Sequence, residues 1–204
     1  MKNSLKKFGT VVALAAALAS CTPNGTSTPT PTPTAGCNTV GTDFQLLYSA
    51  TLASNPLYDN YTTMDLVTHE YTFKANANKT ICTLGYQGNA ALFAASAPYT
   101  MEIYNVTTSS FVYTGNHIFN SVATDYQSIT PTPIVSGNIY TIRRNANTYL
   151  GSIGNTIGRI CRKNAGPAQF PATNGAITII SSNFYGTGGP VPNYGIPYID
   201  IVFQ

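Results

Sequence analysis

Apolar and polar residues alternate with a period of two along much of this chain, which is the pattern of strands with one buried face. Tyr71 and Phe73 alternate with Thr72 and Lys74, for example. Turn-forming Asn and Gly residues separate many of the segments. The segments that predict strands, from this alternation or from a short apolar run, are 44–52, 71–74, 80–86, 99–104, 111–114, 138–144, 176–181 and 196–203.

Short strands joined by turns, with no long helical pattern between them, predict two stacked antiparallel sheets. Only residues 89–97 predict a helix, of one or two turns, which ends before Pro98. The segment 196–203 is apolar on both faces apart from Asp200, so we expect a covered, central strand there. The expected fold class is all-β: an antiparallel β-sandwich, jelly-roll-like.

The N-terminus has the pattern of a secretory signal. Lys2, Lys6 and Lys7 precede an apolar run over residues 8–19. As a helix this run would be about 18 Å long, against about 30 Å for the hydrocarbon core of a membrane. Residues 1–20 are therefore predicted to be a signal peptide and not a membrane span.

The end of that segment resembles a known motif. Leu18, Ala19, Ser20 and Cys21 are similar to the lipobox of bacterial lipoproteins. The resemblance implies that Cys21 is acylated and anchors the protein to the cell envelope, and Thr22 in place of Asp implies the outer membrane, facing either side. The alternative is an ordinary signal peptide followed by a chance Cys.

Composition divides the rest of the chain into a tether and one domain. Residues 21–36 hold the lipidated Cys and a Thr/Pro-rich stretch without charge. Alternating Pro favours polyproline II, so this stretch could extend about 45 Å as a semi-stiff stalk. A Pro-motif ligand is the competing interpretation. Residues 37–204 have the size of one domain with a sizeable core.

Charge is balanced overall but unevenly distributed. The formal net charge of +3 comes from the predicted signal peptide, so it gives no reason to expect binding to nucleic acid. Residues 43–125 carry a net −4 and residues 143–163 a net +5. If the bases met on one surface, they would attract anionic glycans or lipid headgroups. The five bases are Arg143, Arg144, Arg159, Arg162 and Lys163.

Each of these binding hypotheses has a structural alternative. Arg143 and Arg144 are strand neighbours and would point to opposite faces, one of them pairing with a core acid such as Asp200. The Gly/Pro-rich loop 185–195 carries two Tyr that could form a platform for a sugar ring, or could cover a sheet edge. The candidate ligand-binding residues are Arg143, Arg144, Arg159, Tyr185 and Tyr194.

The cysteines and histidines give no metal site. With Cys21 lipidated, Cys82 and Cys161 are the favoured disulfide pair because both follow Ile in strand-like segments, and buried free thiols are the alternative. The Cys residues are too far apart in sequence for a typical zinc site. His69 and His117 are isolated as well, and no cofactor is predicted.

No catalytic constellation is complete. The chain has neither a phosphate loop nor a Gly-x-Ser-x-Gly elbow. His69 and Glu70 are adjacent on a predicted strand and should point to opposite faces. Paired carboxylates for glycoside hydrolysis would have to come from the few available acids, although a buried Asp200 favours a structural role. These acids are Asp59, Asp65, Glu70, Glu102 and Asp200.

Four runs of the domain resemble known modules. Residues 70–73, 79–86, 99–104 and 136–142 are similar to uncharacterised β-sandwich modules of bacterial envelope and carbohydrate-active proteins. The resemblance implies the fold more than any activity. We expect a cell-envelope lipoprotein with a non-catalytic module that binds an anionic or neutral glycan, or another envelope protein. The alternatives are a lipid-anchored glycan hydrolase and a purely structural adhesin or assembly module.

Overall fold

The computed structural model describes residues 36–63, 67–146, 158–186 and 189–204. All of these described residues belong to one compact unit. The predicted signal peptide, Cys21 and the tether up to residue 35 lie outside the described residues, as does Asp65.

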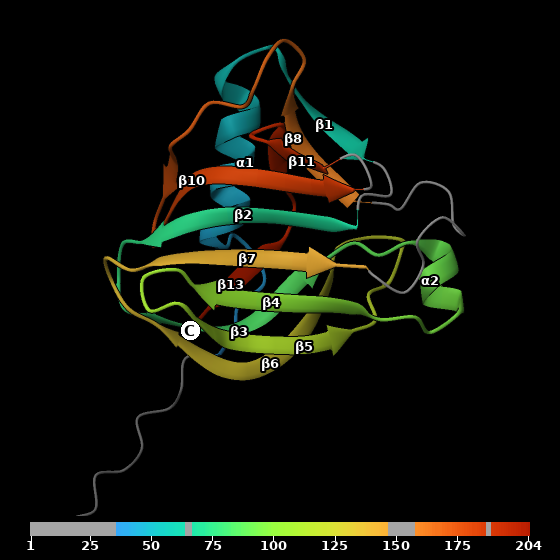
Figure 1. Cartoon of the computed structure of the whole chain (residues 1–204), viewed down its shortest axis with the longest axis vertical. Helices are drawn as coiled ribbons and strands as arrows, with labels where there is room; N and C mark the ends of the chain where they lie inside the picture. The colour runs from blue at the N-terminus through green and yellow to red at the C-terminus, as the bar shows by residue number, and fades with distance from the viewer. Residues whose placement is uncertain (1–35, 64–66, 147–157, 187–188) are drawn as a thin grey trace, which may run out of the picture. The chain divides into compact units, whose positions relative to one another are not determined.

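The described residues form two helices and thirteen strands (Figure 1). All strand pairs are antiparallel. The elements are α1 (Asp43–Ser54), β1 (Tyr58–Thr63), β2 (Thr68–Ala75), β3 (Lys79–Tyr86), α2 (Ala90–Ala94), β4 (Tyr99–Asn105), β5 (Ser110–His117), β6 (Asp125–Ile134), β7 (Ile139–Asn145), β8 (Gly158–Lys163), β9 (Ala172–Asn174), β10 (Ile177–Gly186), β11 (Gly189–Pro192), β12 (Gly195–Pro197) and β13 (Asp200–Phe203).

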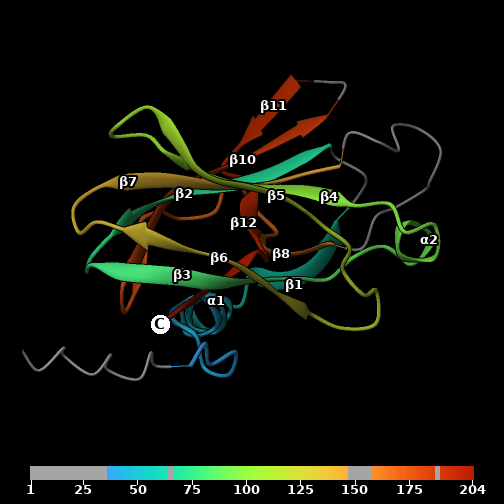
Figure 2. The ribbon, with the colours of Figure 1, turned by 90° about the horizontal axis from the view of Figure 1, so that it is seen from below.

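These strands make one large sheet and two small ones. The seven-stranded sheet has the order β11-β10-β2-β7-β4-β5, with β9 pairing β10, and the small sheets have the orders β13-β3-β6 and β1-β8-β12. Figure 2 shows the large sheet as one layer and β3 with β6 in a second. The predicted all-β, antiparallel, sandwich-like fold is therefore confirmed. The jelly-roll arrangement is not, since the sheets have seven, three and three strands.

The core lies against the inner face of the seven-stranded sheet. On β4 every second residue is buried, β2 alternates from Tyr71 onward, and Tyr71, Phe73, Met101 and Ile103 are all fully inaccessible. Burying such a side chain contributes roughly 1.5–3 kcal/mol. The strands expected within 71–74, 80–86, 99–104, 111–114, 138–144 and 176–181 correspond to β2, β3, β4, β5, β7 and β10, and the expected helix to α2.

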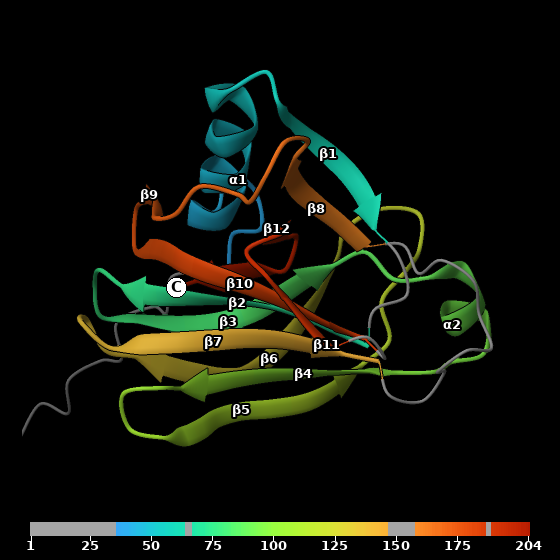
Figure 3. The same ribbon diagram turned by 45° about the horizontal axis from the view of Figure 1, so that its top comes forward.

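The strand predicted at 44–52 is wrong, because this segment is helix α1. Thr42 caps the helix, its side chain accepting a hydrogen bond from the backbone N–H of Gln45. The buried residues are Phe44, Leu47 and Tyr48, at helical spacing. Period two placed Leu46 on the buried face, but Leu46 is 49% exposed and Leu47 is buried instead. The helix packs against β1, β9 and β13, and Figure 3 shows it between β9 and β1.

The end of the chain is covered, as expected, but not central. The segment 196–203 divides into β12 and β13, which lie at the edges of the two small sheets. Ile196, Ile199 and Ile201 are fully buried. Burial on both faces here results from the chain crossing between sheets through the core.

The disulfide prediction is also wrong. Cys82 is bonded to Cys37, and Cys161 is a buried free thiol. Cys82 lies on β3 and Cys161 on β8, which belong to different sheets. In both pairings of β3 the register shifts between Ile81 and Thr83, so Cys82 occupies a β-bulge. A bulge redirects the side chain, and the disulfide fastens the exposed segment before α1 to β3.

Candidate functional site

The outward side of the seven-stranded sheet is polar. Because the inward residues of its strands fill the core, their neighbours point away from it. We call this surface the outer face. Its side chains are Asn183 and Tyr185 of β10, Thr68, Glu70 and Thr72 of β2, Thr141, Arg143 and Asn145 of β7, Thr100, Glu102 and Tyr104 of β4, and Phe111, Thr114 and Asn116 of β5.

A charged row crosses the middle of the outer face. Arg143 lies directly opposite Glu70 on one side and Glu102 on the other. Its Nε donates to Glu70 Oε2 at 2.6 Å, and its Nη1 donates to Glu102 Oε2 at 3.2 Å. The hydroxyl of Tyr185 donates to Glu70 Oε1 at 3.0 Å, and Asn183 Nδ2 donates to that hydroxyl at 2.7 Å. One guanidinium thus fixes two carboxylates across three strands.

Electrostatics supports this arrangement. Burial disfavours the charged form of Arg143, but the hydrogen bonds and charges of Glu70 and Glu102 outweigh it and raise the pKa of Arg143. Burial and the charge of Glu70 raise the pKa of Tyr185, so this hydroxyl stays protonated and keeps donating. The side chain of Arg143 is still 33% exposed, while that of Glu70 is only 9% exposed.

A pocket of about 270 Å³ adjoins this row, lined by Thr68, Arg143, Asn145 and Tyr185. The Oδ1 atom of Asn145 is buried and accepts no hydrogen bond from any described residue. Likewise, no hydrogen bond to a described residue uses Nη2 of Arg143. Nη2 of Arg143 is therefore an unused donor on a residue that lines the pocket, whose size suits a small polar ring, whereas Oδ1 of Asn145 is closed off from solvent.

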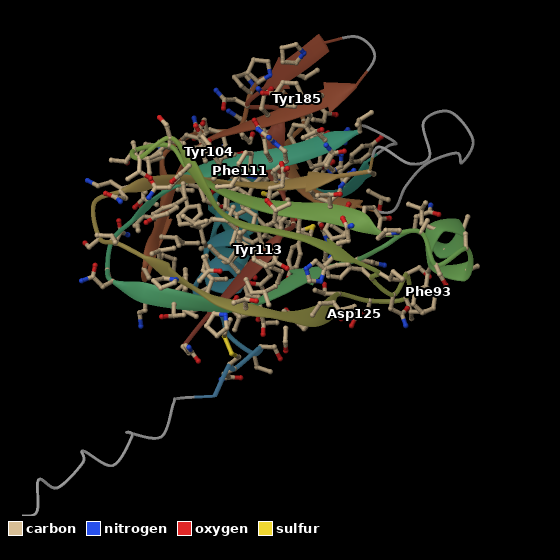
Figure 4. All side chains as sticks on the ribbon, turned by 60° about the horizontal axis from the view of Figure 1, so that its bottom comes forward. Phe93, Tyr104, Phe111, Tyr113, Asp125 and Tyr185 are labelled. Atoms are coloured by element: carbon tan, nitrogen blue, oxygen red, sulfur yellow. A yellow bond between two sulfur atoms is a disulfide. The ribbon has the colours of Figure 1, made fainter. Side chains whose placement is uncertain are left out.

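Aromatic side chains lie at the other end of the outer face. The rings of Tyr104 and Phe111 meet edge to face, with centroids 5.0 Å apart. Phe111 is 56% exposed. Figure 4 shows both beside the β4–β5 turn, with Tyr185 on β10. In Figure 2 the β4–β5 turn and β11 both project from the sheet on this side. Two hairpins therefore flank the outer face.

Arg144 lies on the opposite side of the sheet from Arg143. It is fully buried, with its guanidinium 5.5 Å from the ring centre of Tyr86 and 5.7 Å from that of Tyr99. Its Nη1 donates to the carbonyl of Val67 at 3.2 Å. The expected opposite orientation of the two arginines is confirmed, and Arg144 does not belong to the outer face.

The other bases do not join Arg143. The guanidinium of Arg159 lies 3.9 Å from the ring centre of Tyr198 and donates to Thr124 at 2.6 Å. Arg162 donates to both carboxylate oxygens of Asp59, at 2.8 and 3.2 Å. The basic surface that the sequence suggested is therefore absent from the described residues, because antiparallel pairing brings these bases to different places.

The two Tyr of the loop 185–195 also separate. Tyr185 lies on the outer face, whereas the hydroxyl of Tyr194 accepts a hydrogen bond from Arg162 at 3.2 Å. The ring of Tyr194 packs edge-on against Phe184. Tyr194, Arg162 and Lys163 border a different pocket. The two-Tyr platform is wrong, since strands β10 and β11 place these residues apart.

Asp200 has the structural role that its sequence context favoured. It is fully buried and accepts hydrogen bonds from Thr42, Gln45 and Tyr126 at 2.8–2.9 Å. Burial raises the pKa of Asp200, against the effect of these hydrogen bonds. None of these three side-chain donors is charged, and the backbone of Ile201 also hydrogen-bonds to Asp200, so the acid is held by neutral groups and not by an arginine.

Other candidate chemistry gains no support. In the part of the chain that the structure describes, no group of three or more His, Cys, Asp and Glu residues could hold a metal ion. His69 is buried against Phe184, on the opposite side of β2 from Glu70, as expected. Of the acids considered for hydrolysis, Glu70 and Glu102 share the outer face.

Sequence reasoning missed most of the outer face. Of the five candidate ligand-binding residues, the structure brings only Arg143 and Tyr185 together. Glu102 and Tyr104 occupy alternate positions of a strand that was expected, so their shared face could be inferred. That this strand lies beside β7 could not, because alternation says nothing about which strands are neighbours.

No protein-family model matches the chain, and no curated protein matches it. None of the helices formed by the described residues is long and apolar enough to cross a membrane.

Proposed function

We propose that this protein is a cell-envelope lipoprotein, acylated at Cys21, whose β-sandwich binds a neutral glycan on the outer face. The observation that carries the proposal is the row Glu70–Arg143–Glu102, held by Tyr185 beside a pocket that Arg143 lines with an unused donor. Sugars present many hydroxyl groups in fixed directions. Rigid, preordered polar side chains lower the entropic cost of binding them.

Charge balance favours a neutral ligand over an anionic one. Two carboxylates surround Arg143 and occupy its Nε and Nη1. An incoming anion would have to approach Glu102 as well, and like charges repel. Thr, Asn and Tyr supply most of the other polar groups of the outer face, and these bind hydroxyls without needing charge.

Binding can be tested with the chain from residue 21 onward, carrying Cys21→Ser, against laminarin, xylan, mannan and dextran, with alginate as the anionic probe. We expect at least one neutral polysaccharide to bind, with little change up to about 0.5 M NaCl. Arg143→Met should weaken that binding about tenfold, which is about 1.4 kcal/mol. Lys79→Met is the matched control, because it removes a positive charge from an exposed site on β3.

Two results would contradict this proposal. One is binding to none of the four neutral polysaccharides. The other is binding to alginate alone, with an affinity that falls steeply as salt is added, which would indicate an electrostatic site instead.

The membrane anchor rests on the sequence. The lipobox-like residues Leu18 to Cys21 and the Thr/Pro-rich stretch to residue 36 support a lipidated protein held away from the membrane. Cells fed labelled palmitate should incorporate the label into the wild-type protein and not into Cys21→Ser. Equal labelling of both, or of neither, would remove this part of the proposal.

A lipid-anchored hydrolase is supported by one observation, the two carboxylates Glu70 and Glu102 on the same face. Their strands lie two spacings apart, about 10 Å, which is near the range for glycosidases. However, Arg143 fills the space where a water or sugar would have to react, and both oxygens of Glu70 accept hydrogen bonds. Incubation with a bound polysaccharide should therefore release no new reducing ends.

A further inference from the structure

We propose that the outer face binds an internal stretch of an extended, neutral glycan chain, held between the pocket at Tyr185 and the ring pair of Tyr104 and Phe111. This inference rests on the proposed function and deepens it. It names the ligand class as a chain of several linked sugars and excludes a single sugar or a chain end.

The separation of the two contact regions follows from strand register. Tyr185 pairs with Thr68, Thr68 with Asn145, and Asn145 with Thr100, which places them in one row across four strands. Tyr104 is four residues further along β4 than Thr100. Three strand spacings and four residues of rise give a diagonal of about 20 Å. Several linked sugar rings are needed to cover that distance.

The path between the two regions is polar and partly exposed. It runs over Arg143 and Glu102, whose side chains are 33% and 19% exposed. The Nη2 of Arg143 is a donor and Glu102 an acceptor, and they lie side by side across β7 and β4. Two adjacent hydroxyls of one ring could bind this pair, one accepting and the other donating.

The ring pair of Tyr104 and Phe111 is suited to contact a sugar ring and not a charged group. Phe111 is a large apolar side chain, 56% exposed on a strand at the edge of the sheet. Its ring is fixed edge to face by Tyr104. An exposed, fixed aromatic ring stabilises a flat apolar partner such as the face of a sugar ring.

Because Phe111 lies on an edge strand, the bound glycan need not end at this residue. Strand β5 is the last strand of its sheet, so nothing in that sheet lies beyond Phe111. A glycan that crosses the outer face can continue past β5 into solvent. The flanking hairpins then limit sideways movement and leave the direction of the chain open (Figure 2).

The test is a length series. Oligosaccharides of one to six sugars, prepared from whichever of laminarin, xylan, mannan or dextran binds, are titrated by calorimetry. We expect affinity to rise steeply with length until the chain spans both regions, and then to level off. Phe111→Ala should weaken binding of the hexasaccharide about tenfold, the amount that a lost aromatic contact costs, and leave the disaccharide within about twofold. Arg143→Met should weaken both.

Phe93→Ala is the matched control, because Phe93 is another exposed Phe, at 44%, on helix α2 (Figure 4). This variant should leave the affinity for oligosaccharides of every length unchanged. Equal affinity for one sugar and for six, or no effect of Phe111→Ala at any length, would overturn the inference while glycan binding stands. Binding to none of the polysaccharides would instead remove the proposed function itself.

Discussion

Arg143 and Arg144 are consecutive residues of β7, yet they occupy opposite environments. Arg143 lies on the outer face between two carboxylates and is one-third exposed. Arg144 is fully buried among the rings of Tyr86 and Tyr99. Only the pleat of the strand separates them. A count of charges along the sequence treats the two as equivalent, whereas their positions in the sheet give one a surface role and the other a packing role.

The carboxylates show the same contrast. Glu70 on the outer face is held by a guanidinium at 2.6 Å. Asp200 in the interior accepts from the neutral groups of Thr42, Gln45 and Tyr126. A salt bridge on the face fixes its partners across strands, while neutral donors let an acid remain in the core with its hydrogen bonds satisfied.

The uneven charge along the sequence has the same explanation. The acidic stretch 43–125 and the basic stretch 143–163 do not make two surfaces of opposite sign. Arg143 pairs with Glu70 and Glu102, and Arg162 pairs with Asp59. Each of these pairs joins directly opposed residues of antiparallel strands. Two of the five bases of the basic stretch therefore pair with three acids of the acidic stretch.

The largest effect we predict is the difference between the two arginines in their contribution to the free energy of unfolding. Arg144→Ala removes the largest fully buried side chain and leaves its contacts unfilled, so we expect a loss of about 3–5 kcal/mol in the free energy of unfolding. Arg143→Ala removes a partly exposed side chain and should cost about 1 kcal/mol. Urea denaturation measures both. Equal losses would show that Arg144 does not contribute through burial.

A smaller effect distinguishes the two carboxylates that hold Arg143. A double-mutant cycle of Glu70→Ala with Arg143→Ala should give a coupling energy of about 1 kcal/mol. The cycle with Glu102→Ala should give less, because that hydrogen bond is 3.2 Å long and Glu102 is more exposed than Glu70. A larger coupling for Glu102 would contradict the expectation that Arg143 is held more tightly by Glu70 than by Glu102.

The same comparison shows how much of the fold and of the outer face the sequence could predict. Period two correctly assigned β2, β4 and β7 and predicted that Arg143 and Arg144 face opposite sides. It failed at 44–52, where Phe44, Leu47 and Tyr48 are buried at helical spacing and Thr42 caps the helix. It also gave no strand order, so neither the pairing of Cys82 with Cys37 nor the meeting of Glu70 with Arg143 followed from it.

The smallest effect we predict is on the pH dependence of stability, and it concerns Asp200. Burial raises the pKa of Asp200 in the folded protein, whereas the unfolded chain should titrate near the usual value of about 3.9. The folded state therefore holds this proton more tightly. The stability that results is fully present below the unfolded pKa and is lost as pH rises through the folded pKa.

Asp200→Asn removes this titration and keeps a side chain of the same shape. Its amide can donate to Thr42, whose hydroxyl can turn to accept, so the variant should fold. Urea denaturation of both proteins from about pH 4 to pH 7 gives the difference between their free energies of unfolding at each pH. In this difference the titrations of the other carboxylates cancel. Wild type should lose stability relative to Asp200→Asn as pH rises. The opposite slope would mean that the hydrogen bonds from Thr42, Gln45 and Tyr126 outweigh burial in setting the pKa of Asp200.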